Sequence, residues 1–330
     1  MSDILEVDPD CYDARPYKPG DFESETTSLA STIYRGVFEN GRRYQVVKEG
    51  RSWCPSDEQQ WESLEAGHLI AIILDSHREN PLFYAPVENP KHILDIGTGR
   101  GSWAVDAADL FPETIVRGVD LFPPPGEWLP PNCIMEVDDI LQEWTWRDPF
   151  DLIHLRHMLG SFTPEEWDIV YKHCYDLPKD AYTPNFSERV LEAAENWNHP
   201  LNTVCTMRQS LEKAGFVDIH EKRYRCPIGP WARDATLKEA GRLHYHHWAT
   251  GMEGWAMFML TKWGTPKPWT KEEVQVLVAK VRAELKDPRL HMFQNTRRVW
   301  ARKPTVEEMG GIPVKEEEDV AFIKSEEVEG

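Results

Sequence analysis

The feature that most constrains the fold is a glycine-rich turn placed directly between a buried strand and a helix. Residues 91–96 form an apolar run that predicts a strand, and Gly97, Gly99 and Gly101 follow it. Residues 102–111 then have helical spacing, and Pro112 ends the helix. Glycines let a backbone turn tightly and approach a ligand because no Cβ intervenes. Amides at the start of the next helix can hold an anionic group. The segment predicts a ligand-binding turn, and a plain tight turn is the alternative.

Three more apolar runs predict strands after this helix, at residues 114–120, 133–138 and 150–155. Strands that alternate with helices form βαβ units and a mainly parallel, doubly wound sheet. Such sheets bind ligands beyond the carboxyl ends of their strands. Further helices are predicted at residues 57–77, 164–175, 187–197, 203–214, 232–263 and 270–285, and further strands at 216–224 and 294–301. Ser56 with Gln59, Thr163 and Thr270 are the expected helix N-caps, and Gly215 is an expected C-terminal glycine.

The charge of the chain is concentrated at its two ends. The net charge is −19, of which residues 1–30 carry −6 and residues 305–330 carry −7. Acidic segments of this kind are typical of disordered tails, and their field disfavours direct binding to nucleic acid. Without a long apolar run or a secretory signal pattern, we expect neither a membrane span nor secretion. The six cysteines have no CxxC spacing, which favours a reducing compartment over disulfides or zinc.

Carboxylates occupy the ends of the first three predicted strands. Asp95 precedes Gly97 and could order the turn or bind an ammonium group. Asp120 ends the second strand, where an acid can accept both ribose hydroxyls, and Asp138 with Asp139 ends the third, where a carboxylate can meet an adenine amino group. Each could instead be a turn residue. A dinucleotide fingerprint would be G-x-G-x-x-G, and Asp95 would repel a pyrophosphate. S-adenosylmethionine, which has no phosphate, is therefore favoured over NAD.

Several motifs together resemble those of the fungal LaeA-like methyltransferases, within the class I S-adenosylmethionine-dependent enzymes. The resemblance runs from about Glu25 to Pro304. The matching segments are ETTSLAS at 25–31, ENGRRY at 39–44, DEQ at 57–59, ILDIGTG at 93–99, EWTW at 143–146, DLIHLRH at 151–157, MRQ at 207–209 and AGF at 214–216. The resemblance implies a Rossmann-like fold, S-adenosylmethionine as cofactor, a nuclear or cytoplasmic location, and regulation of secondary metabolism and development. It also implies a velvet-type regulatory protein as a partner.

The family pattern places specific residues of this chain around the cofactor. The expected cofactor contacts are Asp95, Gly97, Thr98, Gly99, Gly101, Asp120, Leu121, Asp138 and Asp139. The expected domain boundaries are an N-terminal tail at 1–30, a helical cap at 31–90, a core at 91–224 and 291–304, a helical lid at 225–290 and a C-terminal tail at 305–330. The methyl acceptor is not implied.

The chain departs from the class I pattern after the fourth strand. The helix ending near Tyr175 passes directly into Asp176-Leu-Pro-Lys-Asp180, and the next segment reads as a polar helix. We therefore predict that the usual fifth strand is missing, with about 20 residues fewer than in the family. Such a loss would leave backbone groups unpaired beside the fourth strand. It motivates a second hypothesis, a regulatory adaptor that binds the cofactor without catalysis; an NAD-dependent oxidoreductase is a weaker third.

Candidate acceptor-side residues lie at the end of the fourth strand. His154, Arg156 and His157 follow one another there, and a histidine could remove a proton from the acceptor. We select His154 and Arg156 for this role, with a buried histidine and a local ion pair as the alternative. Tyr44 is expected to help close the cofactor site, or else to pack as an ordinary aromatic residue. His244, His246 and His247 are read as core or pocket residues, with no metal site. In the C-terminal tail, Lys315 and Lys324 each fit an apolar-Lys-x-Glu sumoylation pattern.

Overall fold

The computed structural model describes most of the chain between residues 36 and 308. The described residues are 36–46, 53–122, 129–146, 148–176, 193–199, 201, 206–286, 291–305 and 307–308. The expected N-terminal tail, almost all of the C-terminal one with Lys315 and Lys324, and much of the predicted helix at 187–197 lie outside these ranges, so those expectations stay predictions.

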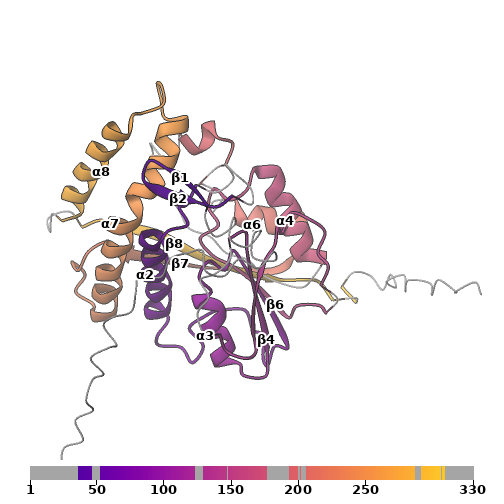
Figure 1. The fold of residues 1–330 in the computed structure, drawn as a ribbon. Helices are drawn as coiled ribbons and strands as arrows, with labels where there is room; N and C mark the ends of the chain where they lie inside the picture. The colour runs from indigo at the N-terminus through magenta and orange to yellow at the C-terminus, as the bar shows by residue number, and fades with distance from the viewer. Residues whose placement is uncertain are drawn as a thin grey trace, which may run out of the picture.

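A four-stranded parallel sheet forms the centre of the molecule (Figure 1). Its strands lie in the order β5-β4-β3-β6. Their bounds are β3 His92–Ile96, β4 Ile115–Asp120, β5 Cys133–Val137 and β6 Leu152–Leu155. All pairings are parallel, and Asp95 of β3 lies opposite Gly118 of β4 and His154 of β6. The mainly parallel α/β sheet predicted from the sequence is confirmed.

Helices cover both faces of this sheet, which gives the doubly wound arrangement. On one face, Trp103, Ala104 and Ala107 of α3 (Ser102–Leu110) pack on Ile93 and Leu152. On the other, α4 (Pro164–Asp176) and α6 (Met207–Ala214) pack on alternate residues of the same strands. Apolar residues on both faces are what a sheet buried between two helical layers requires. Most residues of β3 and β6 are accordingly apolar, with Asp95 and His154 as the polar exceptions at their carboxyl ends.

The helix caps agree with the sequence in three places and differ in one. Thr163 and Thr270 each accept the backbone N–H three residues on, and Gly215 ends α6 with φ 99°. Helix α2 (Glu58–Leu74), however, is capped by Asp57, whose side chain accepts the Gln60 N–H at 3.0 Å. The capping box expected at Ser56 was wrong by one residue, because Arg42 also binds the Asp57 carboxylate and fixes it there.

A long helical unit stands beside the sheet. Helix α7 (Ala235–Trp263) packs along α2 and along α8 (Lys271–Leu285), and the three helices lie together at one side of the molecule (Figure 1). The short strands β1 (Val37–Glu39) and β2 (Arg42–Tyr44) pair next to α7. This unit supplies a second hydrophobic cluster, centred on α7.

The last two strands form a sheet of their own. Strands β7 (Val217–Pro227) and β8 (Phe293–Arg302) pair antiparallel, and no strand joins them to β6 within the described ranges. Residues 177–192, where a fifth strand could have been sought, lie outside those ranges, so its absence stays a prediction. The described chain also has no helix that combines the length and the apolar character needed to cross a membrane.

Candidate functional site

The glycine-rich turn adopts a backbone that other residues rarely take. Gly97, Gly99 and Gly101 have φ of 71°, 59° and 89°, in the left-handed region that favours glycine. The space where a Cβ on Gly97 would stand is filled by the sulfur of Met158, and the methyl group of Met135 fills the equivalent space at Gly101. The conformation therefore favours glycine at all three positions, and packing also requires it at Gly97 and Gly101, whereas a Cβ on Gly99 would make only an ordinary contact with Trp61 at 3.5 Å.

Asp95 binds two groups of the protein itself. Its carboxylate accepts the Thr98 hydroxyl at 2.7 Å and is hydrogen-bonded to His154 Nδ1 at 2.7 Å. The parallel register places His154 opposite Asp95, and the His154 ring stacks on Trp103 of α3 with 3.7 Å between centroids. Burial lowers the pKa of His154 while Asp95 opposes that shift. Of the two roles that the sequence allowed for Asp95, these contacts support ordering of the turn.

Asp120 lies at the carboxyl end of β4, beside the turn. It accepts the backbone N–H of Gly99 at 2.9 Å and that of Phe122 at 3.1 Å. A carboxylate has about four acceptor positions, so these two bonds leave capacity for a bound hydroxyl. Burial raises the pKa of Asp120, and the backbone N–H bonds partly offset that shift.

A cavity lies over the ends of β3, β4 and β5, and we call it the first cavity. Eight of the nine expected cofactor contacts line it, and Gly101 does not. The residues that line it include Asp95, Gly97, Thr98, Gly99, Asp120, Leu121, Asp138 and Asp139. Gly101 is the N-cap of α3, immediately beside the lining residues Arg100 and Ser102. Two rings, Trp61 and Phe122, add aromatic surface, and their centroids are 6.0 Å apart.

The expected acceptor-side residues are differently placed. His154 and Arg156 line the first cavity, and Arg156 is hydrogen-bonded to His68 Nδ1 at 2.7 Å, which in turn contacts Asp106 at 2.8 Å. Tyr44 instead packs in the α7 cluster against Phe258, at 5.6 Å between centroids, and is absent from the walls of the first cavity. The packing role that the sequence left open for Tyr44 is the one its contacts support.

A second cavity shares a wall with the first. Trp53, Cys54, Leu64, His154, Arg156 and His157 line both. The second cavity extends from this wall between α2, β6, α7 and β8, and its other lining residues include Gly67, Ala71, His247, Trp248, Trp255 and Arg298. Most of these side chains are apolar or aromatic, whereas five carboxylates, those of Glu65, Asp95, Asp120, Asp138 and Asp139, line the first cavity.

The histidine cluster of α7 belongs to this second cavity. His244 is hydrogen-bonded to the Pro227 carbonyl and to Gln294, and His247 Nδ1 lies 2.6 Å from the Ser63 carbonyl oxygen. His246 forms an ion pair with Glu62 at the surface. Within the described residues no group of three or more His, Cys, Asp or Glu is arranged to hold a metal ion.

Comparison with known proteins agrees with this architecture. A family model described as a methyltransferase domain matches residues 74–259, more than half of the chain. The chain is 31% identical to the methyltransferase pytC of Aspergillus terreus, over 86% of this chain and 93% of the relative. It is 30% identical to the secondary metabolism regulator LAE1 of Cochliobolus heterostrophus, over 81% and 94%. The chain belongs to the LaeA-like methyltransferases.

Two other similar proteins complete this comparison. The protein-methionine methyltransferase laeA of Emericella nidulans is 28% identical over 81% of this chain and 76% of its own. Among solved structures, a phosphoethanolamine N-methyltransferase 2 from Haemonchus contortus, in complex with S-adenosylhomocysteine, is 18% identical with a TM-score of 0.44. That match covers 77% of this chain and 60% of the other.

S-adenosylmethionine is the methyl donor of the class I family, and the chemistry of the first cavity fits it. The carboxylates of the lining suit ribose hydroxyls, an adenine amino group and an ammonium group, whereas they would repel a pyrophosphate. The three glycines add no side chains of their own to the turn. Trp61 and Phe122 offer ring surface for an adenine.

Two functional candidates of this LaeA-like methyltransferase were not selected from the sequence. His157 lines both cavities and has φ 60°, a backbone conformation that is uncommon outside glycine. Gly67 lies inside α2, where a Cβ would come within 2.6 Å of His157 Cε1. A glycine in the interior of a clear helical pattern was the available signal for this close approach.

Proposed function

We propose that S-adenosylmethionine lies in the first cavity with its methionine end at the Gly97–Gly101 turn. In this proposal Asp120 accepts the ribose hydroxyls, and Asp138 with Asp139 contacts the adenine side. The bound cofactor supplies an electrophilic methyl group on a sulfonium. The protein residues hold the cofactor in place, and the stacked rings of His154 and Trp103 line the cavity next to Asp95.

The observation that carries this proposal is the position of Asp120. Its carboxylate is held by the Gly99 and Phe122 amides at the edge of a cavity that contains the glycine turn. An acid anchored in this way is aligned before the ligand arrives, so less ordering is needed on binding. A methyl transfer then needs chiefly an in-line approach of the acceptor.

Side-by-side calorimetry of the full chain with S-adenosylmethionine and with NADH tests the proposal. We expect saturable binding of S-adenosylmethionine and no heat of binding for NADH. Binding of NADH, or no S-adenosylmethionine binding at millimolar concentration, would overturn the assignment of the first cavity.

We further propose that this methyltransferase takes part in regulating fungal secondary metabolism. The similar LAE1 protein is named a secondary metabolism regulator, which supports this role. A nuclear location and a velvet-type partner belong to the same proposal. Deletion of the gene, followed by metabolite profiling and rescue with the wild-type chain or with Asp120→Ala, tests it. Rescue by both chains would mean that the role does not depend on cofactor binding through Asp120, and rescue by wild type alone would mean that it does.

Methionine methylation is a second candidate reaction, supported by one specific contact. One relative is named a protein-methionine methyltransferase, and the Met158 sulfur of this chain lies directly over Gly97 at the first cavity. Incubation with methyl-labelled S-adenosylmethionine and peptide mass spectrometry would test whether Met158 is modified. Met158→Leu is the matched control because it retains a similar volume.

A further inference from the structure

The second cavity runs along the edge of β6. Leu152, Ile153, His154 and Leu155 all line it, although successive side chains of a strand point to opposite faces. Residues from both faces can border one cavity only where the cavity adjoins the edge of the strand. The other edge of β6 is paired with β3. The cavity therefore occupies the side of β6 on which the described residues place no strand.

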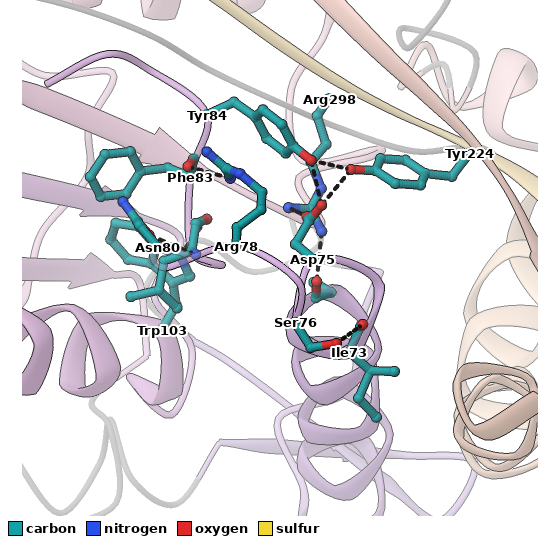
Figure 2. A network of polar contacts seen from close by, with 12 residues as sticks. Ile73, Asp75, Ser76, Arg78, Asn80, Phe83, Tyr84, Trp103, Tyr224 and Arg298 are labelled. Carbon is teal, nitrogen blue, oxygen red and sulfur yellow. Dashed lines mark hydrogen bonds and ion pairs between the residues drawn. The ribbon is translucent and has the colours of Figure 1, made fainter. Parts of the chain in front are cut away.

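The opposite wall of the cavity comes from the other sheet. Gln294, Thr296 and Arg298 line it from β8, and Trp300 lies at the same wall. At this end Tyr84, Tyr224 and Arg298 converge on the buried carboxylate of Asp75 (Figure 2). The network ties the end of α2 to β7 and β8, and two of its members, Tyr84 and Arg298, line the cavity.

The walls of the second cavity favour a flat and uncharged occupant. Rings of Phe83, Trp248, Trp255 and Trp300 provide aromatic surface. No carboxylate is among the lining residues, so an ammonium group would have no partner there. The two lining guanidinium groups already bind protein groups, Arg156 at His68 and Arg298 at Asp75. A charged ligand would lose its hydration without compensation.

Two neutral imidazoles stand at the inner part of the cavity. The rings of His157 and His247 are 5.8 Å apart. Burial lowers the pKa of His247 to about 4 and that of His157 well below its ordinary value, with the Arg156 charge adding to the shift at His157. His247 donates from Nδ1 to the Ser63 carbonyl. A neutral imidazole always retains one nitrogen that accepts a hydrogen bond.

We propose that the second cavity binds the methyl acceptor, a small aromatic molecule with a phenol-like or enol-like hydroxyl, and that His157 receives the proton of that hydroxyl. The inference rests on the proposed function, because it requires a cofactor in the first cavity. His157 is the histidine placed for this because it lines both cavities and has no hydrogen bond to another group of the described chain. His154, by contrast, is bound to Asp95.

The proposed step is balanced without a further reactant. The hydroxyl oxygen loses its proton to the unprotonated nitrogen of His157 and forms a bond to the methyl carbon. The bond from that carbon to the sulfonium sulfur breaks, its electron pair remains on sulfur, and S-adenosylhomocysteine is released. The proton then passes from the imidazolium to water. A phenol has a pKa of about 10, near that of tyrosine, so a hydrogen bond to a neutral imidazole aids its attack more than it would for an ordinary alcohol.

Binding of 2-naphthol by the full chain, measured by calorimetry without cofactor, tests the location. We expect saturable binding that Ala71→Phe weakens about tenfold or more, because Ala71 lines the second cavity on α2. Thr296→Trp, which fills the same cavity from β8, should also weaken 2-naphthol binding. It replaces Ala71→Phe in the test if that variant does not fold. Leu69→Phe is the matched control, since Leu69 is exposed on α2. S-adenosylhomocysteine binding should be unchanged in all three variants, which distinguishes this proposal from that of the first cavity.

The role of His157 is tested with His157→Asn, because asparagine tolerates a positive φ. We expect transfer to 2-naphthol, followed by mass spectrometry of the methyl ether, to fall about 100-fold. The pH dependence of the remaining rate should change as well, whereas S-adenosylhomocysteine affinity should not. The proposal is overturned if wild type does not bind 2-naphthol at millimolar concentration, if the cavity-filling variants bind it as wild type does, or if His157→Asn transfers methyl at the wild-type rate.

Discussion

The two cavities of this methyltransferase share six wall residues and yet differ in chemistry and in origin. The first is lined by carboxylates, and its glycine turn and first acid fall within one stretch, residues 95–101. The second is lined mostly by apolar and aromatic side chains from α2, β6, α7 and β8, which are far apart in the sequence. A cofactor used in common by a family can be read from a local pattern, whereas an acceptor site depends on how distant elements meet.

The largest expected effect concerns the polar network of Asp75, Tyr84, Tyr224 and Arg298 at the wall of the second cavity. Asp75 is fully buried, and its carboxylate balances Arg298 while accepting the hydroxyls of Tyr84 and Tyr224. Asp75→Ala should lower the free energy of unfolding by about 3 kcal/mol, because it leaves the largely buried guanidinium of Arg298 without its carboxylate partner. Urea denaturation measures the change.

Tyr84→Phe is the control for that network, since it removes one hydroxyl and keeps the charge pair. Its expected cost is about 1 kcal/mol. If Asp75→Ala costs no more than Tyr84→Phe, the charge of Arg298 at the wall of the second cavity is not balanced by Asp75, and the contrast with the first cavity is weaker than described.

The cavities should also respond differently to pH. Burial lowers the pKa of His247 to about 4, against an ordinary value of 6.5. The unfolded chain then binds more protons between these two values, so this contribution to stability is complete above pH 6.5 and is lost as the pH falls toward 4. The loss is at most about 3 kcal/mol. Asp120, with a raised pKa, works in the opposite direction, because its contribution falls as the pH rises above its unfolded value.

Unfolding free energies of wild type and His247→Gln, measured from pH 7 to pH 4, separate these contributions. The variant should show a shallower fall in stability with decreasing pH. Parallel curves would mean that His247 titrates normally and that the second cavity is open to water.

Sequence reasoning located the four parallel strands and the first cavity because both depend on local signals. The strand at 91–96, the three glycines and the acids at strand ends all lie near their partners in the chain. Tyr44 was harder to place, because either role suits a buried aromatic residue and only its contact with Phe258, more than 200 residues away, decides between them. The network of Asp75, Tyr84, Tyr224 and Arg298 has no local pattern at all. Its members meet only when α2 packs beside the separate β7–β8 sheet.

In the first cavity, Asp120→Ala should weaken S-adenosylmethionine binding by about 1–3 kcal/mol, as expected for loss of a charged hydrogen-bond acceptor. Calorimetry with S-adenosylmethionine measures the change in affinity. Asp138→Ala is the matched control, because Asp138 is exposed at the neighbouring strand end and should matter less. Equal losses in the two variants would mean that Asp120 contributes no more to cofactor binding than Asp138 does. Unchanged affinity in both would mean that the cofactor does not bind in the first cavity.

The smallest effect is expected at Gly67 of α2. Helices usually prefer alanine to glycine, but at this position two imidazole rings of the second cavity lie close to the backbone. In an exposed helix interior, replacing glycine with alanine stabilises by about 1 kcal/mol. Here the added Cβ would lie 2.6 Å from His157 Cε1 and 3.4 Å from His247 Cε1, so one or both rings must shift. Gly67→Ala should therefore lower the free energy of unfolding by about 1 kcal/mol, whereas Leu69→Ala on the exposed side of α2 should change it little. A gain in stability for Gly67→Ala in urea denaturation would mean that the two imidazoles do not press against α2. The contrast between the cavities would then be weaker, because the walls of the second would not depend on tight contacts of α2 with His157 and His247 from distant parts of the sequence.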